Sequence, residues 1–223
     1  VSLLQAAVVP ADCSALVVAG PQRDLPDQGV AALRGYLEQG GRALVMLDLQ
    51  PKEPVQKLEG LLGEWNVMVG AEAVLYPSNV QAAFGRFVAL AAVSPAHENV
   101  KDLDRLSVAF PLARPVEPGA STAEGLSAQT LLRTDELAYA EKNATAAGLQ
   151  AADYDQGERR GPLSLAVTVT MTSKPAPASP SPVASPSPAE ESPKIEGRAV
   201  VFGTPDVASN LGLTLPVVAS TPR

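Results

Sequence analysis

The sequence predicts an α/β fold, in which a mostly parallel sheet carries helices on both faces and an antiparallel hairpin at its edge. Two apolar runs, 15–19 and 43–47, lack polar alternation, as is typical of strands buried on both faces. Between these runs Val30, Leu33 and Leu37 recur at helical spacing and place one apolar stripe on a helix. This succession predicts a βαβ unit with parallel strands and a right-handed crossover.

The rest of the chain supplies a second helix and several shorter strands. The helix is predicted by four apolar residues at helical spacing, Val55, Leu58, Leu62 and Trp65. Strands are predicted at 1–9, at 66–69 together with 73–76, at 106–116 and at 129–134. Pro111 favours an edge position for its strand, because proline cannot donate a hydrogen bond to a neighbouring strand. Residues 81–93 fit a helix or a strand equally well.

An antiparallel hairpin is predicted toward the carboxyl end of the chain. Residues 163–172 alternate apolar and polar side chains, which indicates a half-exposed strand, and 198–202 form an apolar run that can pair with it. Between them, residues 173–194 consist largely of Pro, Ala and Ser and contain seven of the 21 prolines of the chain. Such a segment buries too little apolar surface to offset its chain entropy, so we expect a disordered insertion that leaves the hairpin intact.

Length and composition indicate one domain over residues 1–223 and exclude several classes of function. A net charge of −7 argues against nucleic-acid binding, which requires clustered basic residues. The single cysteine, Cys13, excludes an internal disulfide and a Cys-x-x-Cys metal site, and is expected to be a small buried side chain. The single histidine, His97, is expected in a surface loop.

Candidate ligand-binding residues follow from the rule that ligands of open α/β sheets gather at the carboxyl ends of the strands. After each of three strands the rule selects a pair of residues, namely Gly20 and Gln22, Asp48 and Gln50, and Asp206 and Ser209. Asp206 has an alternative role as the N-cap of a helix that begins at Val207. No dinucleotide-binding, P-loop or nucleophile-elbow motif accompanies these residues. The sequence therefore predicts no catalytic residue, no metal, no cofactor and no enzymatic activity.

Three blocks of the sequence together resemble a known family. They are ADCSALVVAGPQRDL with LRGYLEQGGRALVMLD, then YDQGERRGPLSLAVTV, and finally RAVVFGTPDVASN. In this order the blocks resemble the extracytoplasmic domain of the GldG-like, gliding-motility-type auxiliary proteins of ABC transporters. The resemblance covers almost the whole chain apart from the insertion at 173–194.

The resemblance implies a Rossmann-like or flavodoxin-like three-layer sandwich, related to the class I amidotransferases but without their catalytic cysteine. It also implies an upstream βα unit and transmembrane segments outside this chain. The expected location is the extracytoplasmic, periplasmic face of the cell membrane, in association with an ABC permease and an ATPase. The family has no established catalytic residues, so the resemblance assigns none here. The start at Val1, without an initiator methionine, agrees with a soluble segment of a longer protein.

Three functions are compatible with these observations, and each is compatible with a homo-oligomer. The leading hypothesis is a non-enzymatic, membrane-anchored auxiliary or substrate-binding-like domain of an ABC transport or gliding-motility-type system. The second is a small-ligand-binding or degenerate amidotransferase-like domain that uses Asp48, Asp206 and Ser209. The third is a protein-protein scaffold that binds partners through its sheet edge or its proline-rich segment.

Overall fold

The computed structural model describes residues 8–77, 87–93, 97–98, 100–103, 107–145, 148–149, 152–173 and 195–210. Within these residues the chain forms two α-helices, twelve β-strands and two short 3-10 helices. In chain order they are β1 (Leu16–Ala19), α1 (Asp27–Glu38), β2 (Arg42–Met46), α2 (Gln56–Glu64), β3 (Val67–Val69), β4 (Ala73–Leu75), β5 (Val88–Val93), η1 (Lys101–Leu103), β6 (Ser107–Pro111), β7 (Val116–Pro118), β8 (Leu126–Arg133), β9 (Tyr139–Glu141), β10 (Arg159–Arg160), β11 (Ser164–Ser173), β12 (Ile195–Phe202) and η2 (Asp206–Ala208). No helix in this part of the chain is long and apolar enough to cross a membrane.

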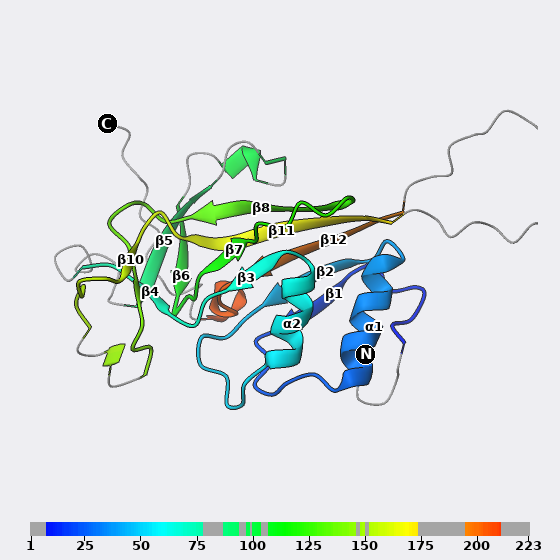
Figure 1. Cartoon of the computed structure of the whole chain (residues 1–223), viewed down its shortest axis with the longest axis horizontal. Helices are drawn as coiled ribbons and strands as arrows, with labels where there is room; N and C mark the ends of the chain where they lie inside the picture. Colours follow the sequence, from blue (N-terminus) through cyan, green and yellow to red (C-terminus); the bar gives the residue numbers. More distant parts are fainter. Residues whose placement is uncertain are drawn as a thin grey trace, which may run out of the picture.

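Seven strands form one mixed sheet in the order β1-β2-β12-β11-β8-β5-β6 (Figure 1). β1, β2 and β12 run parallel, so that Val17 faces Leu44 and Leu44 faces Val200. From β12 onward the strands pair in antiparallel fashion, which makes four of the six pairings of this sheet antiparallel. The remaining described strands form two small sheets, β10-β9-β4 and β3-β7.

The predicted three-layer α/β sandwich with a mostly parallel sheet is wrong. The structure is mostly β, with a curled half-barrel sheet that is largely antiparallel. Both described α-helices pack on the same face of the sheet, because Leu33 and Leu37 of α1 share one core with Leu58 and Leu62 of α2 (Figure 1). A Rossmann-like fold requires helical crossovers onto both faces, whereas here the strands beyond β12 are joined as antiparallel neighbours.

The most local of the sequence predictions are confirmed. The two apolar runs form the parallel pair β1 and β2, and the helix between them is α1. The second amphipathic helix is α2, and Trp65 directly after it is buried in the same core. The predicted hairpin exists as β11 and β12, whose antiparallel register sets Thr168 opposite Val200. Its predicted place at the edge is wrong, because it lies in the middle of the large sheet between β2 and β8, and residues 164–169 of β11 are therefore buried on both faces instead of half-exposed. The chain between these two strands, residues 174–194, lies outside the described residues.

The predictions fail where one apolar pattern covers two strands. Residues 66–69 and 73–76 do not form one strand region, because β3 pairs with β7 and β4 pairs with β9. The pattern at 106–116 divides into β6, which ends at Pro111, and β7, which belongs to another sheet. β6 is the last strand of the large sheet in the described residues, in agreement with the edge position that Pro111 favours.

Several predictions fall partly or wholly outside the described residues. Residues 88–93 of the ambiguous stretch form strand β5, and 81–86 lie outside. Residues 1–7 of the strand predicted at the start of the chain also lie outside the described residues, as do residues 211–213 of the helix predicted from Val207. His97 lies at a turn where its carbonyl oxygen accepts the Val100 amide at 3.1 Å, and Cys13 is half-buried instead of buried.

Two apolar cores lie against different parts of the large sheet. The first joins α1 and α2 to β2, β11 and β12 and includes Val45, Val169 and Val201. The second joins β5, β6 and β8 to the small sheet that contains β4 and β9, and includes Phe110 and Val74. The helices therefore cover one face of β2, β12 and β11. The second core, which includes Ala166 of β11 and contacts Val200 and Phe202 of β12, lies on the opposite face and extends over β8, β5 and β6.

Candidate functional site

The carboxyl ends of β1 and β2 lie side by side, and their loops contain four of the six predicted ligand-binding residues. Gly20 follows β1 directly and its amide donates to the Met46 carbonyl oxygen at 2.9 Å. Its φ of +52° is in the left-handed region, and a Cβ atom there would lie 2.9 Å from Cγ of Pro205. Glycine is therefore required at this position both by the backbone conformation and by the close approach of the chain after β12.

Asp48 is the centre of the hydrogen bonds between the two loops. Gln22 Nε2 donates to Asp48 Oδ2 at 2.5 Å and to the Gly20 carbonyl oxygen at 3.3 Å. The other oxygen, Asp48 Oδ1, accepts the backbone amide of Gln50 at 2.9 Å. The structure thus brings Gly20, Gln22, Asp48 and Gln50 together, as predicted, but both carboxylate oxygens of Asp48 bind residues of the protein itself.

Asp206 and Ser209 lie in a separate turn after β12. The predicted N-cap role of Asp206 is wrong, because Pro205 occupies that position and makes no side-chain cap. Asp206 is instead the first residue of η2, and its amide donates to Thr204 Oγ1 at 3.1 Å. Ser209 Oγ donates to the Asp206 carbonyl oxygen at 3.0 Å. The hydroxyl of Ser209 is thus bound within the turn.

Asp24 ties the loop after β1 to the first turn of α2, which sequence reasoning missed. Its carboxylate oxygens accept the backbone amides of Lys57 at 2.8 Å and of Leu58 at 3.2 Å. These amides have no partner within the helix, so Asp24 serves as a cap from a distant part of the chain. Lys57 Nζ lies 2.7 Å from Asp27 Oδ1, and this hydrogen bond raises the pKa of the exposed lysine.

The most consequential residue that sequence reasoning missed is Arg114, whose side chain is 6% exposed. Its guanidinium donates from Nε to the Gly70 carbonyl oxygen at 2.6 Å and from Nη1 to the Asp48 carbonyl oxygen at 3.2 Å. Nη2 lies 2.9 Å from Oε1 of Glu59 on α2. The Arg114 amide donates to the Gly203 carbonyl oxygen at 2.9 Å, directly after β12. One arginine therefore joins the ends of β2, β3 and β12 to α2.

A weak signal for Arg114 exists in the sequence. It is the only charged residue between Val108 and Val116, in a stretch that is otherwise apolar apart from its prolines. A lone charge in such a stretch has to be satisfied by hydrogen bonds if it is buried. The sequence shows neither the burial nor the carbonyl oxygens that supply the partners, since these come from segments far away in the chain.

Beside Arg114 lies a cleft of 710 Å³. It is lined by Leu49, Gln50, Pro51, Pro54, Val55, Gln56, Glu59, Ala71, Arg114, Lys142, Ala144 and Thr145. The side-chain amide of Gln50 donates to the Ala144 carbonyl oxygen and so joins two walls of the cleft. Its lining combines apolar surface with convergent polar groups, the usual composition of a small-molecule site. Gln50 is the one predicted ligand-binding residue that lines it.

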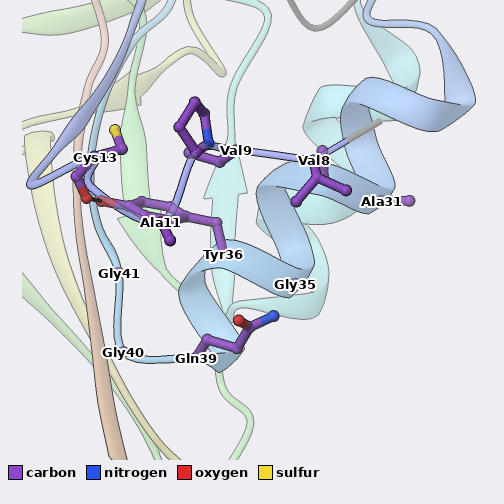
Figure 2. A pocket seen from close by; sticks show the side chains of 12 residues that line it. Val8, Val9, Ala11, Cys13, Ala31, Gly35, Tyr36, Gln39, Gly40 and Gly41 are labelled. Atoms are coloured by element: carbon purple, nitrogen blue, oxygen red, sulfur yellow. Dashed lines mark hydrogen bonds between the residues drawn. The ribbon is translucent and has the colours of Figure 1, made fainter. Parts of the chain in front are cut away.

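A second cavity, of 640 Å³, lies against α1. Figure 2 shows the segment with Val9, Ala11 and Cys13 beside Gly35 and Tyr36 of α1. The Tyr36 hydroxyl donates to the Cys13 carbonyl oxygen at 3.1 Å (Figure 2). None of the residues that line this cavity carries a charge, and none is a predicted ligand-binding residue.

Acidic residues do not form a metal site in the described part of the chain. No group of three or more His, Cys, Asp or Glu side chains there could hold a metal ion. Glu158, which lies near Asp153 and Asp155 in the sequence, is buried and accepts the backbone amides of Asp155 at 2.9 Å and Lys142 at 3.2 Å. Its carboxylate closes a turn of the protein.

The chain is similar to a known protein family and to a solved structure. The model of a family described as an ABC-type uncharacterized transport system matches residues 1–220. Comparison with curated proteins gives no significant match. Among solved structures, the "mmIFT52 N-terminal domain" is similar at 14% sequence identity and a TM-score of 0.53, over 90% of this chain and 72% of that one. At this identity the likeness concerns the fold alone.

Proposed function

The chain belongs to the family of auxiliary components of ABC-type transport systems, of which GldG is a member, and on this premise we propose its role in such a system. The proposed role is that of a non-enzymatic domain on the extracytoplasmic, periplasmic face of the membrane. In this role it contacts the permease and ATPase subunits and is anchored by segments outside this chain. The observation that carries the proposal is the family match over residues 1–220.

The geometry of the strand ends supports a role without catalysis. In α/β enzymes the crevice at the carboxyl ends of the strands holds the substrate. Here the carboxylate of Asp48 is already bound within the protein, since it accepts from the side chain of Gln22 at 2.5 Å and from the backbone amide of Gln50 at 2.9 Å. Asp48 lies in one hydrogen-bonded turn and Asp206 and Ser209 lie in another, which weakens the alternative of a degenerate amidotransferase-like site.

Two measurements on the natural full-length protein test the role. Affinity purification from native membranes is expected to retain the permease and the ATPase, and their absence after mild cross-linking would contradict the association. For the location, Lys52→Cys is introduced in a background in which Cys13, and any cysteine outside residues 1–223, is replaced by serine, so that the one thiol lies on an exposed loop. A membrane-impermeant maleimide is expected to label it in intact cells, whereas labelling only after cell lysis would contradict an extracytoplasmic position.

Small-ligand binding is a second candidate function, and the cleft beside Arg114 favours it. A cleft of 710 Å³ is in the size range of small-molecule sites, about 300–1,000 Å³. Binding of a ligand is compatible with the auxiliary role and does not depend on it.

A further inference from the structure

We propose that the cleft beside Arg114 binds a carboxylate that is attached to a short apolar group. Two classes of molecule share this chemistry, a small branched carboxylic acid and the C-terminus of a peptide. The inference stands on the side chains of the cleft alone, so that it holds or fails independently of the proposed role in transport.

The charges of the cleft favour an anion. Two cationic side chains line it, Arg114 and Lys142, against one carboxylate, Glu59. This local excess of positive charge contrasts with the net charge of −7 of the whole chain. A ligand with a negative group therefore gains more in this cleft than elsewhere on an acidic surface that repels it.

Arg114 has hydrogen-bonding capacity to spare. The contacts with Asp48 and Glu59 use one N–H on each terminal nitrogen, and each of these nitrogens carries a second N–H. The guanidinium is held in place by the Gly70 and Asp48 carbonyl oxygens, so a ligand would not have to order it. Because the side chain is nearly buried, a hydrogen bond to it is stronger than one at the exposed surface.

Lys142 stands at the exposed rim of the same cleft. Its Nζ donates to the Gly157 carbonyl oxygen at 3.2 Å, and its backbone amide is held at 3.2 Å by the buried carboxylate of Glu158. The ammonium group can pair with a carboxylate without losing a carboxylate partner, since the contact to Gly157 is with a neutral carbonyl group. Arg114 at the base and Lys142 at the rim thus supply two donors from separate segments.

The apolar part of the lining fits the other end of the ligand. Leu49, Pro51, Pro54 and Val55 line the cleft beside these donors. Prolines present rigid apolar surface, which loses little conformational freedom when a ligand packs on it. A branched chain of a few carbon atoms next to a carboxylate would satisfy both kinds of lining, whereas a bare inorganic anion would leave the apolar part exposed.

The test uses matched acids and amides with the chain of 223 residues. The acids are 4-methylpentanoate and N-acetyl-leucine, the second as a mimic of a peptide C-terminus, and the controls are the corresponding neutral amides. Binding is followed by amide chemical shifts and expected in the millimolar range or tighter. The acids are expected to shift the amides of Gln50, Val55 and Ala144, and the neutral amides are not. Tighter binding of one acid identifies the source of the carboxylate.

Two substitutions in the cleft have opposite expected effects. Lys142→Gln is expected to weaken binding of the acids by about tenfold, because it removes one of the two cationic donors. Glu59→Gln is expected to tighten it, because it removes the carboxylate that competes for Arg114. The control is Lys52→Gln, which removes the same charge from an exposed residue outside the cleft lining and should leave binding unchanged.

Three results would overturn the proposal. They are equal shifts with acids and amides, shifts by the acids that avoid the residues of the cleft, and a loss in Lys52→Gln as large as in Lys142→Gln. Thermal unfolding of each variant separates a loss of binding from a loss of fold, and the increase expected for Glu59→Gln cannot arise from unfolding.

Discussion

The parallel and antiparallel halves of the large sheet bury their apolar side chains against different kinds of structure. β1, β2 and β12 form a parallel ribbon, and α1 and α2 cover the face of it that carries Val45 and Val201. β8, β5 and β6 form an antiparallel ribbon whose core is completed by the small sheet of β4 and β9. The difference shows how one curled sheet can combine an α/β unit with a sheet-on-sheet packing.

The junction of the two halves is where the candidate site lies. β12 pairs with β2 in parallel on one side and with β11 in antiparallel fashion on the other. Directly after β12, Gly203 accepts the amide of Arg114 at 2.9 Å, and its own amide donates to the Leu165 carbonyl oxygen at 3.0 Å. Since a Cβ atom on Gly203 would lie 1.9 Å from the Arg114 carbonyl oxygen, glycine permits this close crossing.

The largest effect is expected at this junction, for Arg114→Leu. The substitution leaves the half-buried Glu59 and the carbonyl oxygens of Gly70 and Asp48 without their donor, and each buried acceptor left unsatisfied costs about 1–3 kcal/mol. Urea denaturation measures the change in the free energy of unfolding. Arg114→Lys keeps the charge and is expected to lose less. A loss below about 1 kcal/mol for Arg114→Leu would be typical of an exposed pair and would contradict the joining role.

A smaller effect, confined to the antiparallel half, is expected for Thr134→Val. Thr134 is buried, and its Oγ1 accepts the Leu163 amide at 2.9 Å at the entry to β11. Valine has nearly the same shape but leaves this amide unsatisfied, at a cost of about 1–3 kcal/mol. Denaturant unfolding is again the measurement, with Thr134→Ser as the control that keeps the hydroxyl. Equal losses for valine and serine would assign the effect to packing instead.

In the parallel half, Asp24→Ala is expected to lose about 0.5–2 kcal/mol, the usual range for a helix N-cap. The substitution removes the acceptor of the Lys57 and Leu58 amides at the start of α2. Hydrogen exchange of these amides is expected to accelerate more than that of amides in β8. Asp24→Asn retains one oxygen acceptor, so its stability and its exchange rates should fall between those of the natural sequence and those of Asp24→Ala. Unchanged exchange in α2 would show that the cap is dispensable.

The smallest effect is a pH dependence that belongs to the antiparallel half. Burial raises the pKa of Tyr76, and the Asp135 carboxylate raises it further. In the unfolded chain the phenol ionises near its ordinary pKa of about 10, while in the folded protein it stays protonated. The contribution of Tyr76 to the stability of the fold is therefore fully present below about pH 10 and is lost as the pH rises above it.

Tyr76→Phe tests this pH dependence. Phenylalanine cannot ionise, so the variant is expected to lose less stability between about pH 9 and pH 11 than the natural sequence, by under about 1.4 kcal/mol per pH unit. Urea denaturation at each pH provides the comparison, and it is made on the slope because the variant also loses the hydrogen bond from Tyr76 to the Leu90 carbonyl oxygen. Identical slopes of stability against pH in the two proteins would contradict a raised pKa of Tyr76.

The two halves also differ in how far the sequence predicts them. In the parallel half, the apolar runs of β1 and β2 and the stripe of Leu33 and Leu37 are close together in the sequence and identify the βαβ unit. The hairpin of β11 and β12 was predicted from strand alternation in spite of the long insertion between the strands. These predictions succeeded because each depends on one local pattern.

The rest of the fold depends on pairings between distant segments that no local pattern encodes. β8 pairs with β11 and β5, and β4 pairs with β9, although an apolar run such as Val74–Leu75 would fit a parallel sheet equally well. The expectation of helices on both faces came from the apolar runs of β1 and β2, but Val17, on the face of β1 turned away from the helices, is 57% exposed. In the candidate site, the sequence predicted the neighbourhood of Gln22 and Asp48, but not Arg114, whose side-chain partners come from two separate loops and from α2.

β12 pairs in parallel with β2 and in antiparallel fashion with β11. The junction, the position of Arg114 and the cleft all depend on this arrangement. Cross-strand proton contacts in a nuclear magnetic resonance spectrum of the chain test it most directly. Antiparallel strands bring facing Hα atoms close together at alternate pairs, whereas parallel strands do not. We predict Hα–Hα contacts between β12 and β11, along the register that sets Thr168 opposite Val200, and none between β12 and β2. Hα–Hα contacts between β12 and β2, or their absence between β12 and β11, would contradict this architecture.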